Sequence, residues 1–522
     1  MKKFFQTFFL ICIICANYSL FCQTLKLSEI NPEWTTVTKG KALCPPVAVP
    51  AGFVIAHDGN ALTGFLLSGK VFWEKTLQLP SEPSLDSSKY GILFTADKNN
   101  VLYILNCSGI EVYKAQLEKT PDYITAGLDG RYFIFADKKL FCYGANGICK
   151  WNIELSSQKE PVLLSDGSLL VFQPDSTAQN SAVRISPYGE KKQIFEFNSQ
   201  PVNACSTDST LYILLADRTV KTYSMNNFSP KQNLTLPQEL ELKTGKNDFY
   251  FEPDSSNNLY LTLCDKKTLV SFSTADSSIK KKTVLDLSEI KDAQLATDGN
   301  YLLCSCKNWE TMYYKLFPSP KKKLIKETPK KMTQGTLSLI TIPQKKKLLA
   351  SGLYAQEEKE LCEAVYEILE TYYTYLTTPV KNEKTIPPDY VNDTSFLKEI
   401  IDLAGCFGTD YFAQTTARLI TVELKAELLT ALISSASNNG LDPNAQILSA
   451  IEQRLIHPSI QSNTEIIKAA SEALYRLSLY MGTEYSKRAT TILAKIATGN
   501  AGIQQKKEVQ KAMRKIGSLK VQ

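Results

Sequence analysis

A short pattern, a glycine followed four residues later by an aromatic residue, constrains the fold of this chain more than any other feature. The clearest copies run from Gly69 to Trp73, from Gly109 to Tyr113 and from Gly147 to Trp151. Their glycines lie 40 and 38 residues apart. This period is typical of a four-stranded blade of a β-propeller. The repeat therefore predicts a β-propeller, although it does not indicate a function.

About seven repeat units are expected in the first half of the chain. Each contains β segments separated by a turn rich in Asp, Gly or Asn and by a later turn at glycine. The units span Pro46 to Leu77, Tyr90 to Leu117, Tyr123 to Leu155, Val162 to Phe197, Val202 to Leu236, Phe249 to Leu285 and Ala293 to Phe317. Six or eight blades also remain compatible with the sequence. We expect a strand from 34–39 or from 336–342 to complete a terminal blade.

The period changes to that of an α-helix after Leu353. One stripe of apolar residues predicts the first helix: Leu361, Val365, Ile368, Leu369, Tyr372 and Leu376. Several further helices of similar length follow, and those at 466–477 and 503–516 resemble the helices of HEAT or armadillo repeats. The resemblance implies stacked helix pairs with a concave, protein-binding surface. A compact helical bundle that only caps the propeller is the alternative.

Three local signals predict the limits of individual helices. Asp442 and Pro443 predict a helix start, with Asp as the N-cap and Pro in the first turn. Ser462 and Glu465 have the spacing of a capping box. Two glycines are expected to end the helices that precede them: Gly482 and Gly499.

The first residues of the chain have the pattern of an export signal. Lys2 and Lys3 precede an apolar stretch that runs from Phe4 to about Ala16, too short for a comfortable membrane span. We predict a signal peptide at 1–22, cleaved near Cys22. Lipid attachment at Cys22 is the alternative, although bulky Phe21 precedes it where that processing prefers a small residue. The protein is expected to be exported and periplasmic or envelope-associated.

A Lys-rich segment separates the two predicted halves. Residues 321–350 contain nine lysines and one acidic residue, with prolines that discourage helix formation. We interpret this segment as a solvated linker, and its charge could also touch anionic lipid. The predicted organisation is a signal peptide at 1–22, a propeller at 23–320, a linker at 321–350 and a helical domain at 351–522.

The composition limits the kinds of binding site and catalytic site that the chain can form. The chain carries 59 Lys and Arg against 53 Asp and Glu, far from the basic density of a nucleic-acid-binding protein. It has only two histidines, His57 and His457, which excludes a His-rich metal site. His57 beside Asp58 suggests a general base, but a structural histidine fits its position in a strand better.

One pair of cysteines could be placed from the sequence. Cys142 and Cys149 flank a turn at Ala145 and Asn146, which would set them directly opposite each other on a hairpin, within reach of a disulfide. Two buried thiols in a sheet are the other possibility, and we favour them over the disulfide.

The first three units resemble the repeats of quinoprotein-type propellers, in which a glycine turn precedes an aromatic residue that docks between blades. The residues that carry this resemblance are Ser68, Gly69, Trp73, Ser108, Gly109, Tyr113, Asn146, Gly147 and Trp151. The family includes quinone-cofactor dehydrogenases and non-catalytic envelope proteins. Its dehydrogenases carry adjacent cysteines and a calcium site, and the sequence offers neither pattern. We therefore expect the repeat aromatics to pack between blades.

These observations predict a binding protein without enzyme activity. We expect a cell-envelope scaffold whose propeller and helical surfaces bind envelope proteins and not nucleic acid. Membrane contact is expected only through a lipid anchor or the linker. No catalytic, cofactor-binding or metal-binding residue is assigned, and no cofactor is expected. The alternatives are a quinone-dependent propeller enzyme and a propeller that binds wall polysaccharide.

Overall fold

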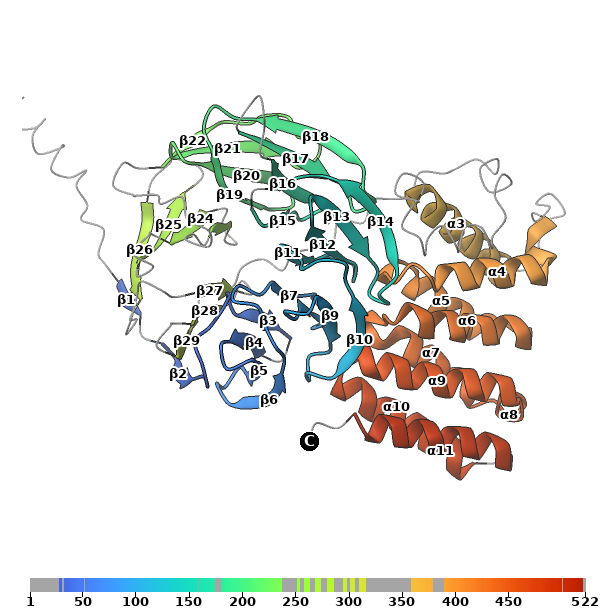
Figure 1. Ribbon diagram of the computed structural model, residues 1–522. Helices are drawn as coiled ribbons and strands as arrows, with labels where there is room; N and C mark the ends of the chain where they lie inside the picture. The colour runs from blue at the N-terminus through green and yellow to red at the C-terminus, as the bar shows by residue number, and fades with distance from the viewer. Residues whose placement is uncertain are drawn as a thin grey trace, which may run out of the picture.

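Most of the chain between Ser28 and Leu519 has a described conformation in the computed structural model (Figure 1). The described residues are 28–30, 32–50, 52–157, 159–173, 180–236, 251–253, 258–262, 268–273, 279–285, 294–297, 301–305, 309–315, 358–378, 389–499 and 501–519. The predicted signal peptide and the Lys-rich segment at 321–350 lie outside these residues.

The first half folds into β-sheets that follow one another along the chain. Each consists mainly of four consecutive antiparallel strands, as expected for a blade. The first three sheets contain β3 (Val47–Val49), β4 (Gly52–His57), β5 (Ala61–Leu66) and β6 (Val71–Thr76); β7 (Leu85–Ser87), β8 (Leu93–Ala96), β9 (Val101–Leu105) and β10 (Glu111–Gln116); and β11 (Tyr123–Ala126), β12 (Tyr132–Ala136), β13 (Lys139–Tyr143) and β14 (Cys149–Glu154).

Four more sheets follow, which gives seven among the described residues. They contain β15 (Val162–Leu163), β16 (Leu169–Gln173), β17 (Ser181–Ile185) and β18 (Lys191–Glu196); β19 (Pro201–Ser206), β20 (Thr210–Leu215), β21 (Thr219–Ser224) and β22 (Leu234–Thr235); β23 (Phe251–Pro253), β24 (Asn258–Thr262), β25 (Thr268–Ser273), β26 (Ile279–Leu285) and β1 (Ser28–Ile30); and β27 (Gln294–Thr297), β28 (Tyr301–Ser305), β29 (Glu310–Lys315) and β2 (Trp34–Val37).

Strands from the N-terminal segment join the last two sheets. β2 pairs antiparallel with β29, so one of the two segments expected to complete a terminal blade does supply an outer strand. β1 pairs in parallel with the edge of β26, which the sequence did not indicate. The first strands of neighbouring sheets contact one another in series, and β27 also contacts β3. Closure of all seven sheets into one ring stays a prediction.

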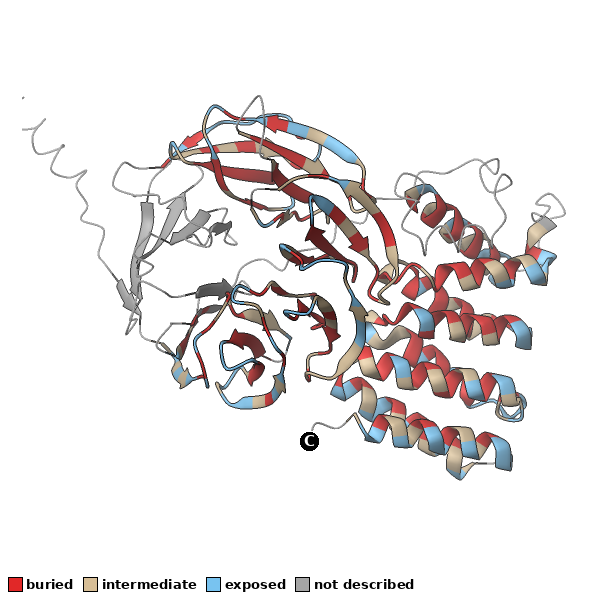
Figure 2. Cartoon of the chain, in the orientation of Figure 1, coloured by how far each residue is buried: buried red, intermediate tan, exposed pale blue. Residues whose placement is uncertain are grey.

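The middle strands of the first, third and fifth sheets are buried on both faces because each of these sheets contacts a sheet on either side. All residues of β4, β12 and β20 are buried, and Figure 2 shows this burial along the centres of the sheets. A strand that faces solvent on one side would alternate apolar and polar residues instead.

The repeated aromatic residues join successive sheets. The Trp73 indole Nε1–H donates to the Cys107 carbonyl oxygen at 2.9 Å. Its ring lies over Gly109, where an added Cβ would come within 2.5 Å of the ring. Tyr113 lies over Gly147 in the same way. The prediction that these aromatics pack between repeat units is confirmed, and each glycine is the site of close approach.

The turn at Gly147 explains why one expectation about the cysteines is wrong. Cys142 pairs with Trp151, while Tyr143 pairs with Cys149, so the two cysteines are not directly opposite. Both are free thiols. Gly147 has a φ of +78° in the turn, which sets Tyr143 opposite Cys149, and a bulge at Lys150 then sets Cys142 opposite Trp151. The assumed symmetric two-residue turn omitted this bulge.

The C-terminal half is a stack of helices in two layers. One layer contains α4, α6, α9 and α11, and the other contains α3, α5, α7 and α10. The helices are α3 (Glu358–Thr377), η2 (Asp389–Asn392), α4 (Thr394–Ala404), η3 (Asp410–Phe412), α5 (Ala413–Val422), α6 (Ala426–Asn439), η4 (Pro443–Ala445), α7 (Gln446–Leu455), α8 (Pro458–Gln461), α9 (Thr464–Met481), α10 (Thr483–Thr498) and α11 (Ile503–Gly517). Stacking of successive pairs buries the apolar stripes that no pair buries alone.

The predicted helix limits are partly right. Gly482 and Gly499 follow the last residues of α9 and α10, as expected. The N-cap of α9 is Asn463 rather than Ser462, and its side chain accepts from the N–H groups of Glu465 and Ile466. Position 463 has the extended backbone that a cap requires, which corrects the capping-box prediction.

Asp442 caps a helix from a greater distance than expected. The short helix η4 separates it from α7, yet its carboxylate accepts from the N–H groups of Ile447 and Leu448 at 2.9 and 2.8 Å. Tyr485 of α10 also donates to it at 2.7 Å. Asp442 therefore ties two neighbouring helix pairs together.

Candidate functional site at the junction of sheets and helices

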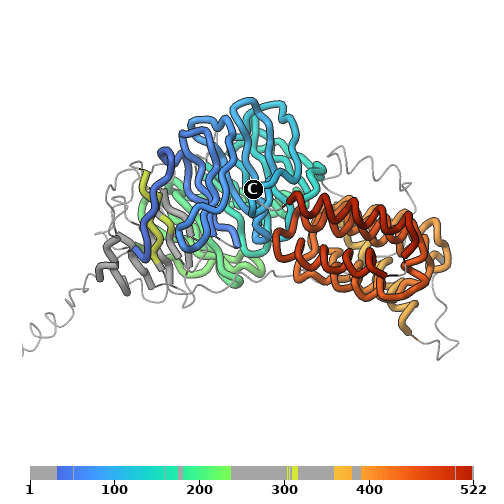
Figure 3. The backbone as a smooth tube through the Cα atoms, turned by 90° about the horizontal axis from the view of Figure 1, so that it is seen from below, coloured from blue at the N-terminus to red at the C-terminus, as the bar shows by residue number. Residues whose placement is uncertain are grey.

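One edge of the helical stack packs against the second, third and fourth sheets (Figure 1, Figure 3). The contacts come from the turns that follow α4, α6 and α9. Because these turns belong to successive helix pairs, they form a row along one edge of the stack. The opposite turns, after α5, α7 and α10, therefore form a row along the far edge.

The middle turn of this junction supplies an apolar anchor. Leu441 is fully buried in a cluster with Ile92, Phe94 and Tyr132 from the sheets. It lies directly against Gly130, where an added Cβ would come within 2.3 Å of the leucine side chain. The junction is therefore closely packed, like the interior of a domain.

Donors from the sheets meet the carboxyl ends of three helices. The Asn106 side chain donates to the Leu479 carbonyl of α9 at 2.9 Å. The Asn146 amide lies within 3.3 Å of the Asn438 carbonyl of α6. The Lys150 ammonium donates to the Cys406 carbonyl just beyond α4. The last four carbonyls of an α-helix have no partner within the helix, and the negative end of the helix dipole favours such donors.

An acidic side chain from η3 makes a second polar contact. Asp410 accepts from the Tyr90 hydroxyl at 2.5 Å and from the Lys89 ammonium at 3.2 Å. Its backbone N–H donates to the Asp129 carbonyl at 2.9 Å. Burial raises the pKa of Asp410, the Asp129 carboxylate adds to this, and Lys89 opposes it.

Arg131 is the centre of a buried ionic cluster. Its guanidinium holds both carboxylate oxygens of Asp129 at 2.8 to 3.0 Å and also donates to the Pro187 carbonyl. The guanidinium carbon lies 4.9 Å from the centre of the Tyr188 ring. This arrangement joins the third sheet to the fourth beside the first helix.

Glu358, at the start of α3, is the member of this cluster with the fewest hydrogen bonds among the described residues. Its side chain is buried, and neither carboxylate oxygen has a hydrogen-bond partner among the described residues. Burial raises its pKa, while the charges of Arg131 and Lys150 oppose that effect. Burial likewise lowers the pKa of Lys150 to about 8, and Glu358 opposes the shift. The cluster therefore contains two buried groups whose ionisation depends on one another.

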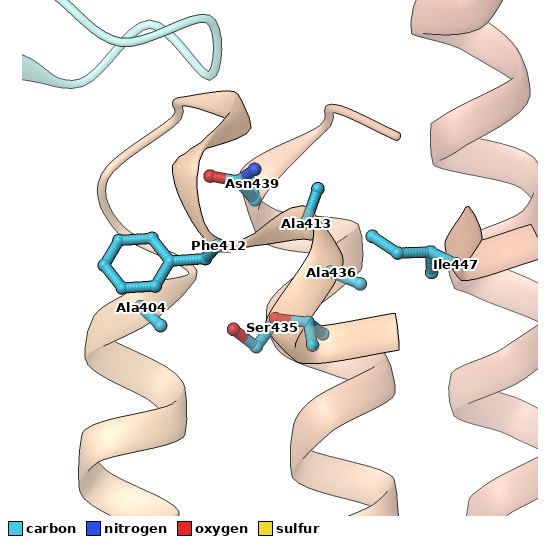
Figure 4. A pocket seen from close by; sticks show the side chains of 8 residues that line it. Ala404, Phe412, Ala413, Ser435, Ala436, Asn439 and Ile447 are labelled. Carbon is cyan, nitrogen blue, oxygen red and sulfur yellow. The ribbon is translucent and has the colours of Figure 1, made fainter. Parts of the chain in front are cut away.

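A small pocket lies within the helices near this junction (Figure 4). Its side chains come from the ends of α4 and α6, from η3 and from the starts of α5 and α7, and its volume is about 10 Å³, about the room that one water molecule needs. Sites for small molecules are usually larger, at roughly 300 to 1,000 Å³. The pocket is therefore too small for a typical metabolite.

The structure places His57 in the first sheet, apart from the junction. His57 is buried, its Nε2 lies 2.9 Å from the Thr63 hydroxyl, and burial lowers its pKa. This geometry fits the structural role predicted for it.

The junction residues were missed because their signals are weak. Lys150 occupies an interior position of the strand β14 between Cys149 and Trp151, where its burial could have been suspected from the neighbouring apolar positions. Leu441 and Asp410 are in turns between helices, where no sequence period applies. Only the packing of helices against sheets gives these residues their partners.

The far edge of the stack exposes aliphatic side chains at equivalent turns. Leu424 follows α5, Ile456 follows α7, and Ile503 begins α11. Their exposed fractions are 82%, 69% and 79%. Single exposed apolar residues are common, but three at corresponding turns of successive helix pairs form a row, which we call the far-edge row.

The described residues contain neither a metal-binding cluster nor a membrane-spanning helix. No group of three or more His, Cys, Asp or Glu side chains in the described part of the chain could hold a metal ion. Among the helices with a described conformation, none is long and apolar enough to cross a membrane.

The repeated four-stranded sheets resemble the blades of a β-propeller, so the chain combines a propeller-type region with a C-terminal helical domain. No family model and no curated protein matches the sequence. Solved structures similar to its first half include virginiamycin B lyase from Staphylococcus aureus (17% identity, 54% of this chain and 99% of that one, TM-score 0.43). Another is BamB from Moraxella catarrhalis (10% identity, 55% of this chain and 97% of that one, TM-score 0.38). A third is a streptogramin B lyase (14% identity, 54% of this chain and 98% of that one, TM-score 0.42).

These similarities correct one expectation. The chain was predicted not to be an enzyme, yet two of these three structures are of lyases. Propeller-type architecture is thus shared by enzymes and other proteins, and it cannot support a non-catalytic assignment. The prediction is withdrawn. The quinoprotein resemblance is likewise not specifically supported, and the similarities do not extend to the helical half.

Proposed function

We propose that this chain is a protein-binding scaffold of the cell envelope, which holds a partner on its helical stack. The far-edge row carries the proposal. Leu424, Ile456 and Ile503 are exposed at corresponding turns, on the side of the stack that faces away from the sheets. Exposed aliphatic residues in a regular row are typical of a protein-binding surface.

The junction supports this role because it fixes the position of the stack. Leu441, Lys150 and Asp410 each join a helical turn to the sheets. A surface that is held rigidly loses less conformational entropy when a partner binds. The envelope location rests on the export signal predicted at residues 1–22 and stays part of the proposal.

Site-specific photo-crosslinking in intact cells would test the proposal. A photoreactive amino acid would replace Leu424, Ile456 or Ile503 in turn, and exposed Thr491 on α10 would serve as the control position. We expect the three row positions to capture the same protein and the control not to capture it.

A loss-of-binding variant completes the test. Changing all three row residues to Ser should abolish capture of that partner from a neighbouring photoreactive position without lowering the thermal stability of the protein, because the side chains are exposed. Equal capture at the control position, or unchanged binding by the Ser variant, would contradict the proposal.

A further inference from the structure

The two ends of the helical stack carry opposite charge. The last two helices, within 483–517, have eight basic residues and two acidic ones. The basic residues are Lys487, Arg488, Lys495, Lys506, Lys507, Lys511, Arg514 and Lys515. The first elements of the stack, α3, η2 and α4 with its N-cap, have two basic residues, Lys359 and Lys398. Their acidic residues are Glu358, Glu360, Glu363, Glu367, Glu370, Asp389, Asp393, Glu399 and Asp402.

The outer face of α11 presents cations that lack counter-charges. Val509, Ala512 and Ile516 face the stack and are buried. Lys507 and Lys511 are exposed on the other face, four residues apart, and form no ion pair with a described residue. The same holds for Arg514, three residues further on. Basic residues of α10 differ, because Arg488 and Lys495 both pair with Glu452.

The outer face of α3 shows the converse arrangement. Its buried stripe includes Leu361, Val365 and Ile368. Glu360 and Glu367, seven residues apart and thus on one face of the helix, are exposed. Neither forms an ion pair with any residue of the described part of the chain.

These faces point away from each other along the stack. α3 and α4 lie at one end and α11 at the other (Figure 1). Within the described residues, no further helix packs beyond α11, and each end presents a pair of adjacent helices. Like charges along one helix face repel, and a face of opposite charge relieves that repulsion.

We propose that copies of this chain associate head to tail, with the basic α11 face of one copy on the acidic α3 face of the next. The contact is heterologous, so a dimer retains one free face of each sign and further copies can add. Further copies of this chain carry the counter-charge for both ends of the stack, whereas an anionic lipid surface would neutralise only α11. This inference goes beyond the proposed scaffold function and does not depend on it.

Sedimentation velocity of the full-length chain tests the proposal. At about 50 mM salt we expect the mean sedimentation coefficient to rise with protein concentration. At about 500 mM salt the apparent dissociation constant should be at least about tenfold higher, because exposed charges are then screened. A monomer at every protein and salt concentration would overturn the proposal. The chain's own lysines at 321–347 would then be the next candidates for the counter-charge of α3.

Charge-reversal variants identify the faces. One variant carries Lys507→Glu, Lys511→Glu and Arg514→Glu, and a second carries Glu360→Lys and Glu367→Lys. Each alone has like charges at both ends and should be monomeric at low salt. An equimolar mixture should associate again, because every contact between the two variants joins opposite charges. A mixture that stays monomeric would overturn the proposed pairing of faces.

A matched control separates this contact from a general effect of net charge. Lys98, Lys138 and Lys139 are exposed on turns and a strand of the sheets. Changing these three to Glu alters the net charge exactly as the α11 variant does, and association should persist. Loss of association in this control, or its survival in the α11 variant, would contradict the proposal. Circular dichroism of each variant verifies that it remains folded.

Discussion

Single residues at the junction combine burial with charge. Lys150 is nearly inaccessible to solvent, donates to the Cys406 carbonyl and has its ammonium 5.2 Å from the centre of the Phe407 ring. Glu358 of α3 and Arg131 act on its charge from two other elements. Such a residue fixes the geometry of the junction and also makes its stability depend on pH.

The first prediction concerns the pH dependence that Lys150 introduces. Its pKa is about 8 in the folded protein against 10.5 ordinarily, and burial is the main cause. Between these two pH values the unfolded chain binds more protons than the folded protein. The contribution of Lys150 to the free energy of unfolding therefore rises as the pH increases from about 8 to 10.5, and it is lost as the pH falls through 8. The rise is at most about 3 kcal/mol.

Urea unfolding of the native protein and of Lys150→Met measures this contribution. The difference in unfolding free energy, native minus variant, should increase between pH 8 and pH 10, because all other titrating groups cancel to a first approximation. Cys142 and Cys406, which also face Lys150, are present in both proteins. A difference that is independent of pH would contradict the prediction.

Elements of the sheet region are joined by an aromatic ring over a glycine. The same contact recurs where Trp34 lies over Gly69 and where Trp151 lies over Gly189. The glycine at each contact has a positive φ and approaches the ring so closely that a Cβ would collide with it. The repeat in the sequence therefore describes the contact between sheets as well as the turn within one sheet.

The second prediction compares two glycines with similar backbone. Gly109 has a φ of +73° and lies under Trp73. Gly167 has a φ of +82°, and the nearest atom to a Cβ added there would be Pro187 Cγ at 3.4 Å. Alanine at either position costs about 1 to 2 kcal/mol for the left-handed backbone. Only Gly109→Ala also overpacks the ring, which should add about 1 to 3 kcal/mol.

Thermal or urea unfolding of the two alanine variants would measure the difference, with Gly167→Ala as the control. Tryptophan fluorescence should also change in Gly109→Ala alone, since only there is an indole displaced. Equal destabilisation by both substitutions would show that the contact between sheets contributes little.

The whole molecule depends on contacts between its two halves. Leu441 lies in the turn between α6 and α7, yet it is buried among side chains of the second and third sheets. Tyr480, near the end of α9, lies in the same cluster. The helical stack is thus part of the packing of the sheets rather than a separate body beside them.

The third prediction tests this coupling with two leucines that are both fully buried. Leu441→Ala removes a contact between the halves, whereas Leu474→Ala removes the same group from the core of the helices. Each should cost about 2 to 5 kcal/mol. In hydrogen exchange, Leu441→Ala should increase exchange in both β12 and the α6–α7 turn, while Leu474→Ala should affect the helices alone.

The exchange pattern of the control decides the interpretation. If Leu441→Ala leaves β12 as protected as in the native protein, the sheets do not depend on the helical turn for their stability. If Leu474→Ala also increases exchange in β12, the coupling runs through the entire stack rather than through this one contact.

Local patterns in the sequence determined a large part of the architecture. The 38- to 40-residue spacing of Gly109 and its equivalents indicated repeated four-stranded sheets, because each unit needs the same turn and the same aromatic contact. The helical period after Leu353 indicated the C-terminal helices, because an apolar stripe must be buried. Gly482 and Gly499 marked helix ends for the same local reason. These features depend on residues that are close in sequence.

Tertiary structure alone determined which residues meet at the junction and which charged helices form the two ends of the stack. Lys150 and Cys406 are 256 residues apart, and no period or spacing relates them. The register at Cys142 depended on the turn at Gly147 and on a bulge at Lys150, and a symmetric two-residue turn would have neither. The opposite charges of α3 and α11 become meaningful only once stacking places these helices at opposite ends. Such features arise from which elements pack together, a choice made by shape and burial across the whole molecule.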